Sequence, residues 1–423
     1  MLLIVVVWSW IAVPNTLQTL LSPKYRSSVG SNNVPYSRVA ALADYGLYVA
    51  VIAVCAAVIL GYLNHVNTQA LGRLAAMIVP WGYIVIRDLY VPTKITHEGV
   101  CYLLIVVAIW TLRPELRRLQ VLGYLMGLTA TLSIVIAIFM PDHAIFRTAL
   151  GEVIAEDKQV LPWGILVGIF TQGNNLAQFL ALGLPTVFLI RRRRDRVLLV
   201  GISCLAIVWS ASRGSMLAVA IGALAYVVLS LSWHAVRRIV GVIAAVAPFV
   251  VVCVVPLVTT DPTAFTNRGL VWLVSLKVWH THEWIGNGSA YFNIVGSTSA
   301  RIAGSVFHGH NQFVQFMVTG GLIFGFLVIP QMLLATGRAA RFAVQGQVFG
   351  VVWLSVLGAT CLFEKSFAYV DNGNFLAAMV VPFAILMFAP PRTGDGTAES
   401  TTDSERADLK TLQGANPSPL RRL

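Results

Sequence analysis

Charged side chains are scarce in this sequence. Lysine, arginine, aspartate and glutamate together make up 11% of the 423 residues, whereas 57% are hydrophobic. Soluble domains carry about 25% charged residues, and a chain this poor in charge has too few polar groups to cover its own surface. The composition therefore excludes a soluble globular protein and indicates that lipid covers much of the chain.

The charge that is present does not have the pattern of a nucleic-acid-binding protein. The net charge is +12, but the arginines lie in short clusters between apolar blocks, most densely at Arg191–Arg194. Such clusters are topology signals of the positive-inside kind. The cysteines, five in all, lie within apolar segments. We interpret them as small core residues and expect neither a disulfide nor a metal site there.

Long apolar blocks make up most of the chain, and a helix needs about 20 apolar residues to cross the hydrocarbon core of a membrane. The sequence therefore predicts an all-α integral membrane protein, a polytopic bundle of about twelve transmembrane helices. The predicted spans are 2–21, 41–62, 70–90, 98–112, 119–140, 162–190, 197–211, 215–232, 239–258, 311–335, 346–363 and 372–388. An even number places both termini on one side.

Basic loops set the predicted orientation, because lysine and arginine are enriched in cytoplasmic loops. The loops that fall on the predicted cytoplasmic side contain Arg113, Arg117, Arg118, Arg191–Arg194, Arg196, Arg237, Arg238, Arg338 and Arg341. Residues 1–388 form the predicted membrane domain, and 389–423 form a disordered cytoplasmic tail. Lys24, Arg26 and Arg38 fall on the outer side, a conflict that vanishes if the first block does not span and eleven helices remain.

Two regions depart from simple spans. The block 159–190 is too long for one span and too short for two, and it contains a polar break at Thr171–Asn175. Non-helical backbone at membrane depth persists only where it is buried in protein or lines a cavity. The outer loop, about 259–310, lies between spans nine and ten. It contains a predicted interfacial helix with Trp272 and Trp279 at the headgroup level.

Two arginines beside this outer face have the chemistry of an anion clamp. Arg213 lies between two spans, next to the hydroxyl of Ser212, and Arg268 begins the predicted interfacial helix. A guanidinium stays charged and binds phosphate oxygens bidentately, so two arginines facing one cavity suit a diphosphate. The alternatives are a tight helix–helix turn with an arginine that reaches the interface, and a solvated loop arginine.

A histidine beside the same face is the predicted base. His310 and Asn311 lie where the outer loop enters a long apolar span, and a neutral imidazole can take a proton from a hydroxyl. The alternative is an ordinary interfacial histidine. The H-x-H spacings at His308 and His310 and at His280 and His282 also permit a metal site, although Glu283 is the only close carboxylate.

Three further polar residues are weaker candidates. Gln172 and Asn174 in the polar break offer amide groups to a sugar or phosphate, or they form hydrogen bonds at a helix end. Arg87 on the third span suits a lipid phosphate, or it pairs with Asp88 beside it. Four polar breaks between apolar blocks therefore contain candidates: the segments at Arg213, at Arg268 and at His310, and the break at Thr171–Asn175. The predicted topology puts all four on the outer face, which indicates one extracytoplasmic site.

At these residues the sequence resembles the O-antigen ligase and polymerase family of bacterial envelope glycosyltransferases, over about 160–388. The matching elements are S-x-S-R-G at Ser210–Gly214, Arg268 ahead of a tryptophan helix, G-N-G at Gly286–Gly288, and His310-Asn311 followed by Gly321. The sequence departs from the family pattern at Phe324, where the family has Gly, Thr or Tyr. It also departs at Gln172 and Gly173, where the family usually has His-Lys.

The resemblance implies transfer of a glycan from an undecaprenyl-diphosphate carrier to a hydroxyl acceptor on the outer side of the bacterial inner membrane. The reaction inverts the anomeric centre and needs no metal or other cofactor. Arg213 and Arg268 would hold the diphosphate, His310 would deprotonate the acceptor, and Asn311 and His308 would orient this base. The lipid bilayer and the two glycan substrates are the implied partners.

The metal-free chemistry agrees with what the sequence lacks. It has no D-x-D motif, and the segment Ser22–Arg38 has no acidic residue, although metal-dependent membrane glycosyltransferases generally place carboxylates there. Two arginines can neutralise a leaving diphosphate in place of a divalent cation. Two alternatives remain: a polysaccharide polymerase with the same donor chemistry, and a flippase or transporter of lipid-linked sugars. A transporter should show inverted repeats and charges at mid-membrane.

Overall fold

The computed structural model describes residues 1–22, 36–62, 70–90, 96–146, 159–298, 308–367, 369–370 and 373–390. Three predicted features therefore lie outside the described residues: Lys24 and Arg26 of the first loop, the end of the outer loop at 299–307, and the tail after Pro390. The chain divides into two units, Met1–Ala389 and Pro390–Leu423. The elements below belong to the first unit.

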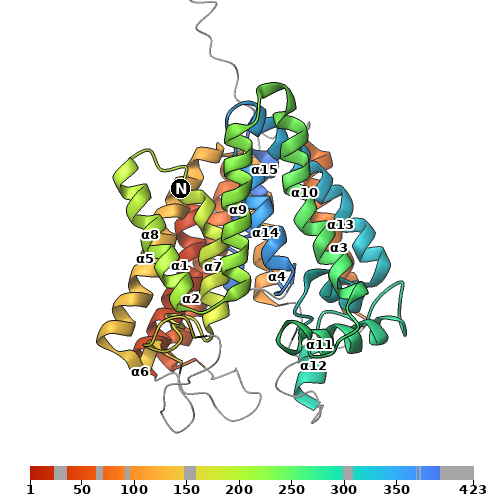
Figure 1. Ribbon diagram of the computed structural model, residues 1–423, viewed down its shortest axis with the longest axis horizontal. Helices are drawn as coiled ribbons and strands as arrows, with labels where there is room; N and C mark the ends of the chain where they lie inside the picture. Colours follow the sequence, from red (N-terminus) through yellow and green to blue (C-terminus); the bar gives the residue numbers. More distant parts are fainter. Residues whose placement is uncertain are drawn as a thin grey trace, which may run out of the picture. The chain divides into compact units, whose positions relative to one another are not determined.

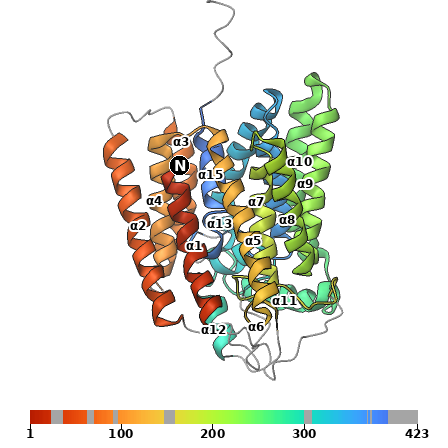
Figure 2. The ribbon, with the colours of Figure 1, turned by 90° about the vertical axis from the view of Figure 1, so that its left-hand side faces the viewer.

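The described residues form helices and contain no strand. The helices are α1 (Leu2–Leu21), α2 (Arg38–Tyr62), α3 (Leu71–Asp88), α4 (His97–Leu112), α5 (Gln120–Phe139), α6 (Pro141–Ala144), α7 (Gly173–Val187), α8 (Arg193–Trp209), α9 (Arg213–Leu231), α10 (His234–Val258), α11 (Ala264–Trp279), α12 (Tyr291–Thr298), α13 (Gln312–Val344), α14 (Phe349–Cys361) and α15 (Val380–Phe388). Two short 3-10 helices are η3 (Leu116–Leu119) and η4 (Gly373–Phe375). Figures 1 and 2 show the long helices side by side, with α11 and α12 at one end of the bundle.

Six helices of the described residues are long and apolar enough to cross a membrane. They are Leu2–Leu21, Arg38–Tyr62, Leu116–Phe139, Arg213–Leu231, His234–Val258 and Gln312–Val344. The predicted class, an all-α membrane protein, is confirmed. The first apolar block forms a helix of 20 residues, so its length is sufficient to span. The total of twelve spans and the side on which each end lies stay predictions.

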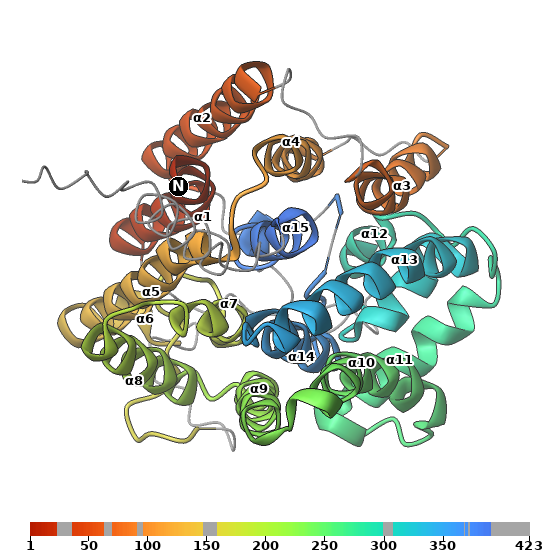
Figure 3. The same ribbon diagram turned by 90° about the horizontal axis from the view of Figure 1, so that it is seen from above.

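Some apolar blocks are buried protein core instead of long lipid-facing helices. Every residue of α14 and of α15 is buried, and α15 has only 9 residues. Figure 3 shows α15 in the middle of the bundle, beside α4 and α13. Composition does not separate these cases, because lipid and protein interior accept the same side chains. Of the predicted span 372–388, only the second half is α-helical.

The polar break in the block 159–190 is present. Residues 160–172 are non-helical, and α7 begins at Gly173 with Gln172 as its N-cap. The segment Ile165–Phe170 is buried in the protein, as non-helical backbone at that depth requires. A hypothetical Cβ on Gly173 would lie 2.8 Å from the carbonyl oxygen of Ser210. This close approach brings the start of α7 against the end of α8.

Helix α13 is kinked at Gly321, where φ is 68° and ψ is −167°. The kink interrupts the helical hydrogen bonds, and the loop after α11 replaces them. Asn287 and Gly288 donate to the carbonyls of Val318 and Thr319 at 2.7 and 2.9 Å. On the other side of the kink, Leu322 donates to the carbonyl of Glu283 at 2.8 Å, and Ile323 donates to that of Trp284 at 3.2 Å. The G-N-G motif and the glycine of the kink thus belong to one structural unit.

The same loop is held by the last turn of α3. Arg87 donates through Nε to the carbonyl of Ile285 at 3.1 Å and through Nη2 to that of Gly286 at 2.8 Å. The carboxylate of Asp88 accepts from the backbone and hydroxyl of Ser289 at 2.9 and 2.5 Å. We call the kink, the loop 283–289 and these two side chains the clasp. Arg87, a candidate for a lipid phosphate, is engaged here by backbone carbonyls.

The predicted helix in the outer loop exists. Trp272 of α11 is 0% exposed and packs in a small core with Phe292 and Val314. Its side chain therefore faces the protein interior and not the lipid headgroups, whereas its depth in the membrane stays a prediction. The apolar face of α11 packs on α13 through this core. Because α13 carries His310 and Asn311 at its start, the contact fixes α11 relative to the candidate base.

Candidate functional site

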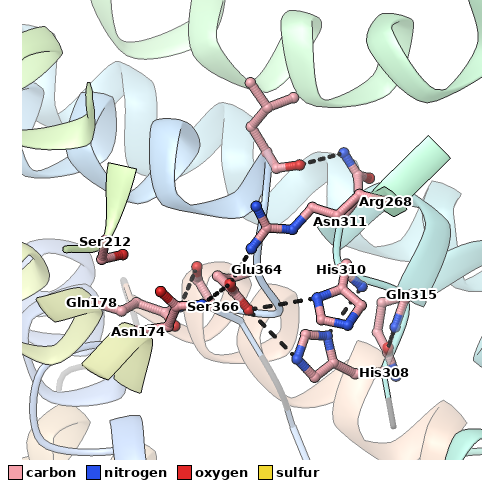
Figure 4. Close-up of polar contacts among 12 residues, drawn as sticks. Asn174, Gln178, Ser212, Arg268, His308, His310, Asn311, Gln315, Glu364 and Ser366 are labelled. Carbon is pink, nitrogen blue, oxygen red and sulfur yellow. Dashed lines mark hydrogen bonds and ion pairs between the residues drawn. The ribbon is translucent and has the colours of Figure 1, made fainter. Parts of the chain in front are cut away.

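Glu364 is the centre of a polar cluster to which four side chains from distant parts of the chain converge (Figure 4). Its Oε1 is 2.6 Å from Nη2 of Arg268 and accepts a hydrogen bond from Asn174 at 3.3 Å. Its Oε2 is 3.4 Å from Nε2 of His308 and 4.0 Å from Nδ1 of His310. We call these five residues the Glu364 cluster. Three of the four predicted polar breaks thus contribute to one site.

The backbone that carries Glu364 is anchored from two helices. After α14 ends at Cys361, Oε1 of Gln312 on α13 accepts from the backbone N–H groups of Ser366 and Phe367 at 2.9 and 2.7 Å. Gln178 on α7 donates to the hydroxyl of Ser366 at 2.7 Å. These bonds satisfy a buried non-helical segment. They also hold the carboxylate between α7 and α13.

Arg268 is positioned by an unusual stretch of backbone. Phe265, Thr266 and Asn267 have φ of 54°, 62° and 66°, in the left-handed region that costs a non-glycine residue of order 1–3 kcal/mol. Regular helix starts directly after them, so Arg268 begins it, as predicted. The guanidinium lies 5.3 Å from the centre of the Phe363 ring, within the range of a cation–π contact. Strained backbone and an aromatic face together direct this side chain toward Glu364.

His310 has a fixed backbone. Its φ is 47°, and its N–H donates to Nδ1 of His308 at 3.0 Å. Asn311, which is 0% exposed, caps α13 by accepting from Val314 at 3.1 Å. The amide of Asn311 also donates to the carbonyls of Val252 and Leu362 at 3.0 and 3.1 Å. Asn311 therefore ties the start of α13 to α10 and to the end of α14, and it acts on His310 through the backbone.

The hydrogen bonds of His308 define its state. Burial, followed by the charges of His310, Lys365 and Arg268, lowers the pKa of His308 well below its ordinary value of 6.5, so the ring is neutral at pH 7. Nδ1 accepts the N–H of His310. The proton of the neutral ring is therefore on Nε2, which faces Oε2 of Glu364 at 3.4 Å.

The cluster has a partial fit to a metal ion. His308, His310 and Glu364 offer ligand atoms that all lie within 4.8 Å of one another, and ligand atoms of a tetrahedral zinc site are about 3.4 Å apart. Two features oppose binding. Oε1 of Glu364 already pairs with Arg268, and the tautomer of His308 places a proton on the nitrogen that would bind the metal. The donor set thus suits a hydrogen-bonded network better than a cation.

Arg213 and Ser212 lie at the start of α9. Arg213 is the first residue of α9, and the hydroxyl of buried Ser212 donates to that of Ser215 at 3.0 Å. A hypothetical Cβ on Gly214 would lie 3.3 Å from the ring of Phe363, the residue before Glu364. In Figure 4, Ser212 stands apart from the side chains around Glu364. The amide of Gln172 makes no hydrogen bond to the described residues.

Sequence reasoning missed Glu364. Glu283, the carboxylate that the sequence places close to the H-x-H spacings, pairs with His280 at 2.7 Å in the loop after α11. The carboxylate that lies near His308 and His310 is instead Glu364. One signal was available: Glu364 is the only acidic residue between Glu283 and Asp371, and it directly follows an apolar block. An isolated carboxylate at the end of a buried helix needs a partner. Three candidate partners, Arg268, His308 and His310, were already in the predicted site.

Comparison with known protein families gives one match. The model of the O-antigen ligase family matches residues 198–329, less than half of the 423 residues. No curated protein matches the chain. The predicted O-antigen ligase-like resemblance is thus confirmed over this region, and it supports glycosyltransferase-like activity in general. The matched residues include Arg213, Arg268 and His310, whereas Asn174 and Glu364 lie outside them.

Proposed function

We propose that this protein transfers a glycan from a polyprenyl-diphosphate carrier, of the undecaprenyl type, to a hydroxyl acceptor on the extracytoplasmic side of the bacterial inner membrane. The observation that carries the proposal is the convergence of Arg268, His308 and His310 on one carboxylate. A phosphate-binding cation, Arg268, and a candidate base, His310, thus lie within one cluster, and both belong to the region that resembles O-antigen ligases.

The donor diphosphate binds by exchange with Glu364. Arg268 presents one nitrogen to Oε1 in the free protein, and its planar fork suits two phosphate oxygens better than one carboxylate oxygen. Arg213, at the start of α9, binds the same diphosphate from the other side of Phe363. When Arg268 turns to the donor, Glu364 keeps its contacts with the histidines. Donor binding at Arg268 thereby affects the base His310 through their shared partner Glu364.

The chemical step is a single displacement. His310 takes the proton of the acceptor hydroxyl while the hydroxyl oxygen forms a bond to the anomeric carbon of the donor sugar. The bond from that carbon to the diphosphate oxygen breaks, and polyprenyl diphosphate leaves with the electron pair. The arginines stabilise the charge of the leaving group. Attack opposite to the leaving group inverts the configuration at the anomeric carbon, and no metal takes part.

The remaining residues support this step. His308 is neutral and accepts the backbone N–H of His310, so it holds the backbone of His310 in place. Asn311 fixes the start of α13. Asn174 holds Oε1 of Glu364 at 3.3 Å and remains its partner when Arg268 leaves. Gln172 and Ser212 offer an amide and a hydroxyl to the sugar or the phosphates. Arg87 contributes through the clasp.

Purified full-length protein tests the proposal. It is incubated with a polyprenyl-diphosphate-linked oligosaccharide and either a lipid-anchored core oligosaccharide, as a ligase requires, or a second donor molecule, as a polymerase requires. We expect release of polyprenyl diphosphate and a new linkage of inverted configuration with one acceptor, which also separates ligase from polymerase. Glu283→Gln, outside the cluster, is the control that keeps activity. No release of polyprenyl diphosphate with either acceptor would overturn the proposal.

A further inference from the structure

Four arginines from two helices and the end of a third gather at the C-terminus of α15. Arg73 of α3 donates to the carbonyl of Met387 at 2.7 Å. Arg338 of α13 donates to that of Leu386 at 2.8 Å and also to that of Ala389. Arg113, the C-cap of α4, and Arg341 of α13 lie close enough that their charges act on those of Arg73 and Arg338. We call these four residues the arginine cluster.

The arginine cluster carries more positive charge than the described residues neutralise. No aspartate or glutamate of the described ranges forms an ion pair with any of the four. The helices α4, α13 and α15 end here, and each C-terminus contributes about half a negative charge, so roughly 1.5 negative charges face four positive ones. Nε of Arg113 is buried and has no hydrogen-bond partner there. The described residues therefore leave an excess of positive charge at the arginine cluster, which a bound anion can balance.

The position of the arginine cluster indicates what kind of anion binds. Arg73 is 15 residues before Asp88 on α3, or about 22 Å along the helix, so the arginine cluster lies at the end of α3 opposite to the clasp. Apolar side chains beside it face outward: Leu71 is 48% exposed, and Leu333 and Leu334, about one turn before Arg338, are 65% and 38% exposed. Phosphate-binding cations thus adjoin surface that suits acyl chains.

We infer that the arginine cluster is a binding site for the headgroup phosphate of an anionic phospholipid, in the leaflet opposite to the Glu364 cluster. Basic pockets between helices at the cytoplasmic side recognise such headgroups. Arg73 and Arg338 fix the end of α15, which leaves Arg113 and Arg341 to bind the phosphate. The acyl chains lie along α3 and α13. A zwitterionic lipid carries a positive charge of its own, so it neutralises less of the excess positive charge of the arginine cluster.

The test compares retention of two lipids by the full-length protein. Wild-type protein in nanodiscs of equal phosphatidylglycerol and phosphatidylcholine is extracted into detergent, and retained lipid is measured by native mass spectrometry. We expect preferential retention of phosphatidylglycerol and a loss of this retention, by about tenfold or more, in the Arg113→Gln/Arg341→Gln double variant. Neither of these side chains caps α15, so the variant should fold, which circular dichroism and gel filtration check.

A second double variant makes the result specific. Arg193→Gln/Arg194→Gln removes two exposed arginines at the start of α8, whose first turn contacts α5 through the hydrogen bond from Tyr124 to Asp195. This control should keep phosphatidylglycerol. Unchanged retention in the first variant, or equal loss in both, would overturn the inference. Displacement of the lipid by millimolar inorganic phosphate alone would instead assign the site to a soluble phosphate. None of these measurements depends on glycan transfer.

Discussion

Two arrangements near the outer loop each combine an arginine with a carboxylate, and they use the charges in opposite ways. In the clasp, Arg87 and Asp88 are adjacent in sequence, yet both are directed to the loop 285–289, Arg87 to carbonyls and Asp88 to the N–H and hydroxyl of Ser289. In the Glu364 cluster, Arg268 and Glu364 are 96 residues apart in sequence, yet their side chains pair at 2.6 Å.

The difference separates a structural from an exchangeable use of charge. An arginine that donates to backbone carbonyls satisfies groups that have no other partner, and its removal leaves them unpaired. An arginine that faces a carboxylate can exchange that carboxylate for another anion, because the guanidinium and the incoming ligand keep the same kind of bond. The clasp should therefore determine stability, whereas the Glu364 cluster should determine transfer.

The largest effect is expected at the base. A positioned base contributes about 10²- to 10⁴-fold, so His310→Ala should nearly abolish transfer while the protein still inserts and binds the lipid-diphosphate donor. His308→Ala is the matched variant and should reduce transfer less, because this ring acts through the loop. Turnover by His310→Ala above about a tenth of wild type, given that contribution, would show that another group takes the proton.

The arginines of the anion clamp should have the next largest effect. Lysine keeps the charge of Arg268 but loses the planar fork, so Arg268→Lys should lower kcat/KM by about tenfold or more, which corresponds to about 1.4 kcal/mol. The same is expected of Arg213→Lys. Arg87→Lys is the control from the clasp and should change activity per folded molecule little. Near-normal kcat/KM in both variants would show that Arg213 and Arg268 only anchor the chain at the membrane interface and do not bind the diphosphate.

Removal of charge from the clasp should lower stability instead. Asp88→Asn cannot accept both bonds from Ser289 as an anion does, and the loss should cost about 1–3 kcal/mol of the free energy of unfolding. Thermal unfolding in detergent, followed by circular dichroism, measures the change. Glu364→Gln is the counterpart in the other arrangement and should lower transfer with a smaller change of thermal midpoint. If the two substitutions have the same profile, the division between the two arrangements is wrong.

The pKa of His308 adds a smaller, pH-dependent effect on stability. Because the folded protein lowers this pKa well below 6.5, the unfolded chain takes up a proton at higher pH than the folded protein does. The free energy of unfolding should therefore fall as the pH drops below about 6.5. Chemical denaturation at pH 7.5 and pH 5.5 should show this decrease in wild type. A His308→Gln variant should show a smaller decrease, and an equal one would assign it to other groups.

Chelation should have the smallest effect. Since Nε2 of His308 carries a proton and Oε1 of Glu364 pairs with Arg268, the cluster should work without a bound metal, and transfer should survive excess EDTA. Activity that disappears with EDTA and returns with Mg²⁺, Mn²⁺ or Zn²⁺ would instead make His308, His310 and Glu364 metal ligands.

The sequence predicted the helices better than their surroundings. The first block, 2–21, matches α1 in full, whereas the break predicted at Thr171–Asn175 overlaps only the end of the non-helical segment 160–172, because α7 begins at Gly173. The burial of α14 and α15 was not predictable from hydropathy, because an apolar run is equally suited to lipid and to a protein core. The clasp was not predictable either. The only trace that its backbone hydrogen bonds leave in the sequence is the glycines that allow the close approach.

The site was partly predictable for a related reason. Arg268, His308 and His310 were predicted as members of one site, since charged and titratable residues between apolar blocks stand out. Glu364 was not predicted as their common partner, because its pairing with residues up to 190 positions away depends on how the helices pack. Local patterns specify which residues are candidates, whereas the packing of α7, α13 and α14 determines which of them meet.

The sequence separation within the Glu364 cluster has a consequence for biogenesis. During synthesis, Arg268 emerges from the ribosome 96 residues before its carboxylate, and α13 and α14 must insert before Glu364 can reach it. The nascent chain thus holds a strained, positively charged loop without its acidic partner until almost the whole membrane domain has been made. Completion of the site is therefore a late event, so the proposed transfer would begin only after almost the whole membrane domain has been made.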